Sequence, residues 1–293
     1  MSHALRTPAA RSPKVITDAD FLKFREFFYR KTGIHFEDNK RYFVDKRLLE
    51  RMAATQSDDF RSYFVGLRFE RDGRELQQLV NAMTVNETYF LRESYQFDCM
   101  TRDLMDELLR QKPPGERIRI WSIPSSTGEE PYSIAMQLLE RWPGIDRHEV
   151  EILSSDIDTT VLEAAQRGVY SQRSVANVPK AWLERYFSRS GNGEWTISRE
   201  LVAAVEFSQV NLSDPASTRR FRDIDLIFCR NLLIYFDDVS RRAAAEALYD
   251  ALRPGGFVCL GHSESMSRIS SLYRVRRFAD AMVYQKPLNG EAP

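Results

Sequence analysis

Residues 117–139, RIRIWSIPSSTGEEPYSIAMQLL, predict a buried strand, a tight polar loop and a helix that begins near Pro131. Residues 118–121 supply the bulk that strands favour, whereas residues 122–128 are too rich in Pro, Ser, Thr and Gly to continue either element. Pro131 suits a first helical turn, where its missing N–H costs nothing. A strand that feeds a helix through such a loop is typical of an open parallel α/β sheet, whose ligands bind beyond the carboxyl ends of the strands.

The start of this helix indicates which ligand the loop can accept. Glu129 and Glu130 are adjacent acids that stabilise a helix N-terminus without any ligand, so a βα unit that binds nothing is one interpretation. The two acids also repel phosphate, and the chain contains neither GxGxxG nor GxxxxGK[ST] at this loop. A ligand with hydroxyl groups or a positive centre therefore fits the loop better than a phosphate does.

Length and composition are those of a cytoplasmic protein with two domains. The 293 residues, 43% of them hydrophobic, suffice for one substantial core and a smaller second one. Lys plus Arg balance Asp plus Glu at 42 each, so the overall charge gives no support for a nucleic-acid partner. The three widely spaced cysteines favour reduced thiols over disulfides or a metal site, and no apolar run approaches the roughly 20 residues of a membrane span. We expect a monomer with no metal, no direct membrane insertion and a disordered N-terminus over residues 1–16.

Residues 17–83 predict a helical N-terminal domain, because apolar residues recur at helical spacing and strand signals are scarce. The second helix of this domain, which begins near Asp38, carries a cationic stripe opposed only by Asp45 and Glu50. A solvated helix face is the simpler interpretation of the stripe, and a docking surface for an acidic partner is the alternative. The cationic residues are Lys40, Arg41, Lys46, Arg47 and Arg51.

The motif TVNETYFLRE at residues 84–93 breaks the helical rhythm and predicts a linker over residues 84–98. Residues 89–91 are bulky for a solvated loop, so we expect the linker to dock on another part of the protein. Arg92 follows these apolar residues closely enough for its guanidinium to be partly desolvated, which would require an acidic partner from protein or substrate. An ordinary salt bridge is the simpler explanation.

Polar residues follow the next predicted strands. An acid in the position of Asp156, directly after residues 149–155, accepts from both ribose hydroxyls in doubly wound nucleotide sites. Asp158 suits the N-cap of the next helix, which leaves Asp156 as the ligand candidate. Residues 224–229 are almost wholly apolar and predict a central strand, which places the residues that follow at the mouth of a cleft. Those residues are Arg230, Asn231 and Tyr235. A turn cap is the alternative interpretation of Asn231.

The complete pattern predicts a sheet of seven strands with one insertion. Residues 168–201 interrupt the alternation of strands and helices, and their Gly-Asn-Gly turn predicts a small β element. A surface excursion without a role is the simpler interpretation of this insertion. The seven strands lie near residues 118–121, 149–155, 205–210, 224–229, 257–260, 273–277 and 281–285.

This arrangement resembles the class I methyltransferase fold, a Rossmann-like α/β fold that uses S-adenosylmethionine. A glycine-bearing loop follows the first strand, an acid follows the second, and a hairpin ends the sheet. Five motifs in a fixed order behind a helical N-terminal domain are similar to those of the CheR family of bacterial chemotaxis receptor methyltransferases. They are NETYFLRE, STGEEPYSIAM, SDIDTTVL, IFCRNLLIYFD and PGGFVCLGHSES. One departure is Ile-Pro-Ser at residues 123–125, where family members often have Ala, Gly or Cys.

The resemblance spans roughly residues 18–286 and implies a methyltransferase domain over residues 99–293, with an inserted β-subdomain at about residues 170–203. It implies methylation of glutamate side chains of methyl-accepting chemotaxis receptors, with S-adenosylhomocysteine as the second product. The candidate catalytic residues are Arg92, which either orients the acceptor carboxylate or only positions the cofactor, and Tyr235, which would pack against the incoming side chain. The cationic stripe becomes an implied receptor-binding surface that includes Lys46, Arg47 and Arg51. The implied cofactor contacts are Asn86, Thr88, Arg92, Glu129, Asp156, Asn211, Leu212, Asn231 and Leu232.

Two other functions compete with receptor methylation. A small-molecule or RNA methyltransferase would share the sheet but lack these motifs, and an RNA substrate would usually bring a basic excess. A methyltransferase-like regulatory protein that binds S-adenosylmethionine without methylating receptors would keep the fold and lose contacts. No expected cofactor position is visibly broken in this sequence.

Overall fold

The computed structural model describes residues 15–291, which divide into two compact units. The smaller unit contains the residues up to Phe28 together with Phe36–Met83, and the larger unit contains Tyr29–His35 and the chain from Thr84 onward. Most of the predicted disordered segment, residues 1–14, lies outside the described residues. Ile16 is buried in the smaller unit. In the described part of the chain, no helix combines the length and the apolar character needed to cross a membrane.

The smaller unit is helical, as the apolar periodicity predicted. Phe24 and Phe28 are fully buried with their ring centroids 5.3 Å apart, and Leu48 and Met52 are buried on the next long helix. The helix predicted near Asp38 opens with one 3-10 turn and becomes α-helical at Arg41. The elements are α1 (Asp18–Thr32), whose last turn belongs to the larger unit, η1 (Asp38–Lys40), α2 (Arg41–Ala54), α3 (Phe60–Phe69) and α4 (Arg74–Met83).

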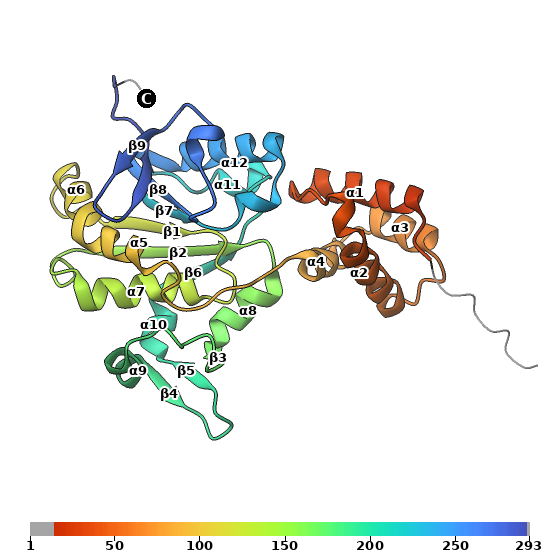
Figure 1. The fold of residues 1–293 in the computed structure, drawn as a ribbon, viewed down its shortest axis with the longest axis horizontal. Helices are drawn as coiled ribbons and strands as arrows, with labels where there is room; N and C mark the ends of the chain where they lie inside the picture. Colours follow the sequence, from red (N-terminus) through yellow and green to blue (C-terminus); the bar gives the residue numbers. More distant parts are fainter. Residues whose placement is uncertain (1–14, 292–293) are drawn as a thin grey trace, which may run out of the picture. The chain divides into compact units, whose positions relative to one another are not determined.

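The larger unit is built on a mixed sheet in which the described residues form seven strands, in the order β6-β2-β1-β7-β8-β10-β9 (Figure 1). Neighbours from β6 to β8 are parallel, and β10 is antiparallel to both β8 and β9. The predicted sheet with its final hairpin is confirmed. The strands are β1 (Ile118–Ser122), β2 (Val150–Asp156), β6 (Val205–Gln209), β7 (Ile224–Cys229), β8 (Leu252–Leu260), β9 (Arg274–Arg277) and β10 (Met282–Gln285).

One strand of the large sheet begins well before its predicted start. β8 begins at Leu252 rather than near Phe257, because Leu252 already pairs with Ile224 of β7. The register then shifts before Leu226 pairs with Phe257, so Pro254 and the glycines after it occupy an irregular stretch inside the strand. Proline and glycine are tolerated within strands at such irregularities.

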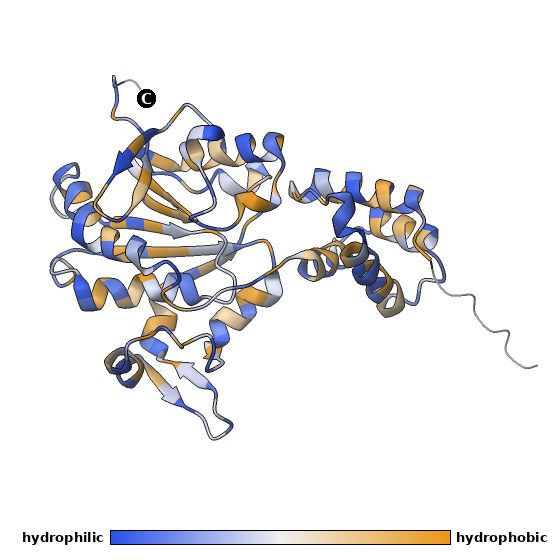
Figure 2. Cartoon of the chain, in the orientation of Figure 1, coloured by the Kyte–Doolittle hydropathy of each residue, from blue (hydrophilic) through white to orange (hydrophobic). Residues whose placement is uncertain are grey.

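Side chains of the central strands alternate between two cores, one on each face of the sheet. Ile120 and Phe228 belong to one core, and Trp121 and Cys229, the next residue on each strand, belong to the other. Figure 2 shows much of the middle of the large sheet in orange, whereas the edge strand β9 is blue. The surrounding helices are α5 (Ser94–Cys99), η2 (Met100–Leu104), α6 (Met105–Arg110), α7 (Glu129–Arg141), α8 (Thr159–Arg167), α11 (Pro215–Thr218), η3 (Leu233–Tyr235), α12 (Asp238–Ala251) and η4 (Met266–Arg268).

The loop between β1 and α7 turns at Gly128. This residue has φ +96°, and a Cβ atom there would lie 2.8 Å from the Tyr132 ring and 2.9 Å from the Ala165 Cβ. Glycine is therefore required both by the backbone conformation and by the space around it. α7 begins at Glu129, two residues before the predicted start, so Pro131 still lies in the first turn.

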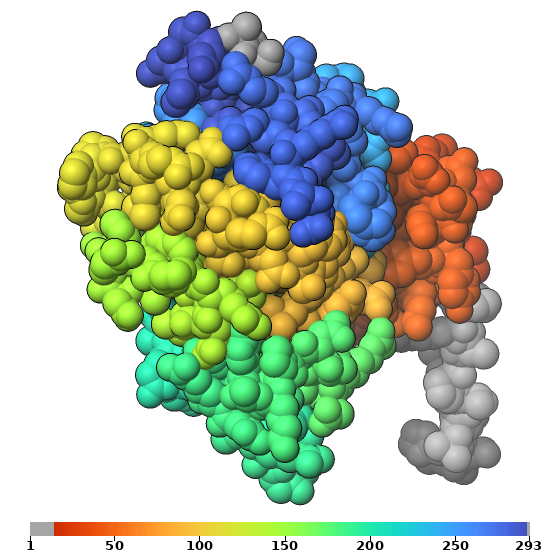
Figure 3. All heavy atoms as spheres, turned by 60° about the vertical axis from the view of Figure 1, so that its left-hand side comes forward, coloured from red at the N-terminus to blue at the C-terminus, as the bar shows by residue number. Residues whose placement is uncertain are grey.

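The insertion forms a separate small sheet. Within the described chain it has three antiparallel strands in the order β3-β5-β4, which confirms the predicted β element. Its atoms gather in one lobe of the larger unit, drawn in green in Figure 3. The elements are β3 (Val169–Tyr170), α9 (Lys180–Tyr186), β4 (Phe187–Arg189), β5 (Trp195–Ile197) and α10 (Arg199–Ala203).

Candidate functional site

A cleft opens at the point where the strand order of the sheet reverses. β1 lies between β2, whose neighbour is β6, and β7, whose neighbour is β8. Ligands of open α/β sheets bind at such a switch point, beyond the carboxyl ends of the strands. The cleft has a volume of about 270 Å³ and lies within the larger unit. Its walls include Asn86, Thr88, Tyr89, Arg92, Pro124, Ser125, Ser126, Glu130, Arg230, Asn231 and Tyr235.

The first wall is the segment that was predicted to be a linker. Phe90 is fully buried, with its ring 4.7 Å from that of Tyr170 and its N–H donating to the Ser174 carbonyl at 3.0 Å. The Leu91 N–H donates to Ser133 Oγ at 2.9 Å. The segment is thus fixed to the larger unit, and it ends where α5 begins at Ser94, inside the range predicted to be linker.

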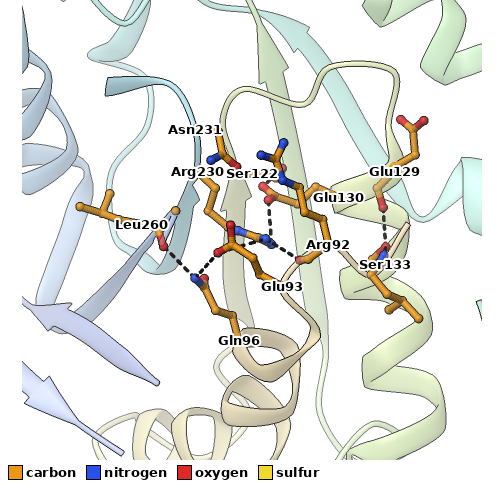
Figure 4. Close-up of polar contacts among 12 residues, drawn as sticks. Arg92, Glu93, Gln96, Ser122, Glu129, Glu130, Ser133, Arg230, Asn231 and Leu260 are labelled. Atoms are coloured by element: carbon orange, nitrogen blue, oxygen red, sulfur yellow. Dashed lines mark hydrogen bonds and ion pairs between the residues drawn. The ribbon is translucent and has the colours of Figure 1, made fainter. Parts of the chain in front are cut away.

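Arg92 reaches the cleft from this segment. Its guanidinium Nη1 donates to the Glu87 carbonyl at 2.9 Å and lies over the Tyr89 ring, with 5.8 Å from Cζ to the ring centroid. Glu130, an acid that also lines the cleft, forms its ion pair with a different cation, Arg230. Glu130 Oε2 lies 3.2 Å from Arg230 Nη1 (Figure 4).

Asp156 ends β2 beside the loop that follows β1. Its carboxylate accepts from the Ser126 N–H at 2.8 Å and from the Asp158 N–H at 3.0 Å. Burial raises the pKa of Asp156 to about 6, although both backbone N–H groups favour the ionised form. A carboxylate has about four acceptor sites, so these two bonds leave capacity for a ligand. Asp158 caps α8 by accepting from the Thr160 N–H at 2.8 Å, which is the capping geometry that its position suggested.

The opposite wall follows β7 and depends on a carboxylate that sequence reasoning did not assign. Asn231 has φ +58°, a conformation that asparagine tolerates better than most residues. Glu264 holds it there by accepting from the N–H groups of Asn231 at 2.8 Å, Leu233 at 2.7 Å and Gly261 at 2.9 Å. Burial raises the pKa of Glu264, and these backbone donors oppose the shift. The sequence feature that could have indicated Glu264 is its position in the loop directly after β8, two residues after His262.

The cleft brings together some of the residues implied for the cofactor and not others. Asn86, Thr88, Arg92, Asn231 and the implied catalytic Tyr235 line it, and Asp156 holds the lining residue Ser126.

The remaining implied cofactor residues do not line this cleft. The buried Glu129 carboxylate accepts from Thr127 Oγ1 at 2.6 Å and from Ser174 Oγ at 2.7 Å. Asn211 Nδ2 donates to the Lys31 carbonyl at 2.7 Å, and Leu212 is buried in the core beside Leu232.

The implied receptor-binding residues lie on α2 of the smaller unit, and the structure separates their surroundings. Lys46 is exposed, and Arg47 donates to Glu50 Oε2 at 3.0 Å. Arg51 is mostly buried, and its Nη2 lies 2.5 Å from Glu75 Oε2, which links α2 to α4.

The residues around the cleft suit S-adenosylmethionine better than a phosphate ligand. Carboxylates at the cleft and directly beneath it, Glu130 and Asp156, can face a positive centre and accept from hydroxyl groups. Within the described residues, no group of His, Cys, Asp and Glu side chains is arranged to hold a metal ion. A seven-stranded sheet with a reversed last strand, and a cleft at its switch point that contains both glutamates and arginines, is the architecture of a class I S-adenosylmethionine-dependent methyltransferase.

Comparisons with known proteins narrow this class to one family. Residues 86–281 match the family "CheR methyltransferase, SAM binding domain", and residues 19–84 match "CheR methyltransferase, all-alpha domain". The protein belongs to the CheR methyltransferase family.

Three curated relatives illustrate the similarity. Chemotaxis protein methyltransferase 2 of Vibrio cholerae is 52% identical over 278 residues, covering 95% of this chain and 96% of the relative. Chemotaxis protein methyltransferase 2 of Pseudomonas aeruginosa is 39% identical, covering 88% and 90%. The Escherichia coli chemotaxis protein methyltransferase is 35% identical, covering 89% of each chain.

Proposed function

We propose that this protein methylates glutamate side chains of methyl-accepting chemotaxis receptors with S-adenosylmethionine. Membership of the CheR family over both units carries this proposal. The relatives of similar length are chemotaxis protein methyltransferases, which favours a chemotaxis receptor over a small molecule or RNA as the acceptor.

The reaction makes modest demands on the protein. When bound, S-adenosylmethionine supplies a methyl group whose bonding electrons remain on sulfur, so that S-adenosylhomocysteine is released. The acceptor glutamate has an ordinary pKa of about 4.3, so it is already ionised at neutral pH and needs no general base. Alignment of the carboxylate is therefore the main contribution required of the side chains.

Arg92 and Tyr235 are the residues that we assign to this alignment. Both line the cleft, and Arg92 retains hydrogen-bonding capacity because only its Nη1 contact to the Glu87 carbonyl is fixed by the protein. A guanidinium orients a carboxylate through paired N–H donors. The half-buried Tyr235 ring would narrow the path by which the acceptor glutamate enters the cleft. Burial raises the pKa of the Tyr235 hydroxyl, so it stays protonated at neutral pH and can donate.

The cofactor contacts that we assign follow the same edge of the sheet. Asn86, Thr88, Arg92 and Asn231 would bind it from the cleft walls, and the Asp156 carboxylate would accept from its ribose hydroxyls. Glu129, Asn211, Leu212 and Leu232 would complete the site. They occupy the start of α7 and the segments that follow β6 and β7.

The direct test combines the protein with labelled S-adenosylmethionine and receptor-bearing membranes. Treatment with base should then release labelled methanol, because carboxyl methyl esters hydrolyse under conditions that leave N-methyl and ordinary O-methyl ethers intact. Receptors whose acceptor glutamates are replaced by alanine provide the control. Label that stays on the receptor after base, or that appears on the control receptor, would contradict glutamate methylation.

A further inference from the structure

The side chain of Arg230, directly after β7, is buried at the wall of the cleft and contacts the segment that carries Arg92. The residue is 4% exposed. Its Nη2 donates to the Arg92 carbonyl and lies 3.6 Å from Glu93 Oε2, and its Nη1 lies 3.2 Å from Glu130 Oε2 (Figure 4). One guanidinium thus joins the end of β7, the start of α7 and the backbone of the Arg92 segment.

The backbone on both sides of Arg92 is in an unfavourable conformation. Leu91 and Glu93 each have φ +56°, in the left-handed region that residues other than glycine rarely adopt. Such conformations are strained and persist only when the surrounding structure determines them. The bond from Arg230 to the Arg92 carbonyl falls between these two residues, where it can hold the turn.

Glu93 is anchored from two further directions. Gln96 Nε2 donates to Glu93 Oε2 at 3.0 Å and to the Leu260 carbonyl at 2.7 Å, which connects the turn to the end of β8. His262 Nδ1 lies 2.9 Å from Glu93 Oε1. Figure 4 shows that the Arg92 side chain leaves this network while its carbonyl remains bound within it.

The Arg230 guanidinium is held mainly by protein groups, although the residue also lines the cleft. Its Nε and Nη1 atoms are buried and make no hydrogen bond with the described residues, and the carboxylates of Glu93 and Glu130 flank its charge. The Phe97 ring covers the guanidinium, with 5.3 Å from Cζ to the ring centroid. Arg230 therefore borders the cleft as a buried group between two protein carboxylates, whereas the Arg92 guanidinium has no ion pair of this kind among the contacts of the described residues.

We propose that Arg230 is a positioning residue for the methyl transfer, because it fixes the strained Leu91–Glu93 turn and thereby aims the Arg92 guanidinium into the cleft. The proposal rests on the proposed function, in which Arg92 aligns the acceptor carboxylate. A misplacement of about 1 Å can lower a rate by two orders of magnitude, so a small relaxation of this turn is enough to matter.

Arg230→Lys is the informative variant. Lysine keeps a positive charge between Glu93 and Glu130, but a single ammonium cannot reproduce the planar arrangement of donors. We expect kcat to fall at least about tenfold in the otherwise unchanged protein and by less than about twofold in an Arg92→Ala background, because the aimed group is then absent. Comparable losses in both backgrounds would overturn the positioning role.

Two further variants keep the test decisive. Arg253→Lys is the matched control, because Arg253 Nη1 also lies 3.2 Å from a buried carboxylate, that of Asp225, and its Nη2 donates to the Gln111 carbonyl, near the amino end of β7. It should lower the melting temperature without any coupling to Arg92.

If Arg230→Lys fails to fold, Glu93→Gln should lower kcat about threefold or more, again only when Arg92 is present. An unchanged kcat in folded Glu93→Gln would then overturn the proposal.

The first measurement is methanol release by the unsubstituted protein. Failure there would overturn the proposed function. Normal release combined with additive effects of Arg230→Lys and Arg92→Ala would overturn the positioning role alone.

Discussion

At the scale of single residues, Asp156 makes the clearest prediction about the cofactor. Its carboxylate is 3% exposed and already accepts from two backbone N–H groups, so its position is fixed before any ligand binds. Asp156→Ala should weaken S-adenosylmethionine binding by about 1.5–3 kcal/mol, the value of a charge-assisted hydrogen bond. Calorimetry on the folded variant measures this loss, and an unchanged affinity would move the ribose contact to another residue.

The pH dependence of binding gives a second test of Asp156. Burial raises its pKa to about 6, so its ordinary ionised form is lost at a higher pH than for an exposed aspartate. Because the protonated acid is a weaker acceptor, cofactor affinity should fall as pH falls through about 6. Asp156→Asn, which does not titrate, should bind more weakly at pH 7 and show less of this fall. An identical pH profile in the variant would assign the dependence to another group.

Arg92 and Tyr235 make a prediction about turnover rather than binding. Arg92→Ala and Tyr235→Phe should each lower kcat by about tenfold or more, because alignment of the acceptor is the contribution assigned to them. Receptor affinity should change much less, since both residues lie in the cleft and not on α2. Turnover is measured at saturating cofactor, with receptor binding measured in parallel. A variant with normal turnover would remove that residue from the site.

At the scale of elements, α2 shows that the cationic residues of a predicted stripe need not all lie on an exposed surface. Arg51 lies against Glu75, and Glu75 Oε1 also accepts from the buried Tyr63 hydroxyl at 2.8 Å. This cluster joins α2, α3 and α4, so part of the predicted stripe serves the helical unit itself. Lys46 and Arg47 are the residues of the proposed receptor-binding set that remain suited to docking.

The structural role of Arg51 and the docking role proposed for Lys46 and Arg47 can be tested with separate variants. Arg51→Gln should destabilise the protein by about 1–3 kcal/mol, because the Glu75 carboxylate loses its partly buried charged partner. Lys46→Glu combined with Arg47→Glu should leave stability nearly unchanged and weaken receptor binding, since exposed ion pairs contribute little to folding.

Salt provides the control for this comparison. Docking by exposed cations is screened over about 8 Å at physiological ionic strength, so binding should weaken as salt is added and weaken less in the double variant. Denaturant unfolding and receptor binding at two salt concentrations measure both effects. Unaltered methylation by the double Glu variant would make α2 a solvated face.

Most elements could be predicted because their signals are local. Apolar runs such as residues 224–229 mark central strands, and residues at or just beyond the carboxyl end of such a strand lie at the ligand edge, as Asp156 and Asn231 do. The contacts of Arg230 and Glu264 could not be predicted, because each joins segments far apart in the sequence. Glu264 accepts from the Asn231 N–H, 33 residues away, and Arg230 donates to a carbonyl 138 residues away. Hydrophobic periodicity contains no information about such pairs.

At the scale of the whole molecule, the remaining question is which receptors the enzyme accepts. A receptor tail can be captured by adding a strand to an exposed sheet edge, which requires an edge and pockets for alternate side chains. In the small sheet, the outer strand β4 has only the three residues Phe187–Arg189. Backbone groups of the turn that follows bond to one another and are not free to pair with a peptide. The Ser190 N–H donates to the Glu194 carbonyl at 2.8 Å, and the Gly193 N–H donates to the Ser190 carbonyl at 3.0 Å.

We therefore predict that the hairpin near residues 191–197 does not bind a receptor C-terminal peptide strongly, and that receptors without such a tail are methylated. Removing the tail from a receptor should change the methylation rate by no more than about twofold, because a tether that does not bind adds no effective concentration. Titration with tail peptides is the complementary measurement, with Gly191→Phe and Gly193→Phe together as the altered hairpin. Micromolar binding that disappears in this double variant would show that three residues of edge are enough to hold a tail.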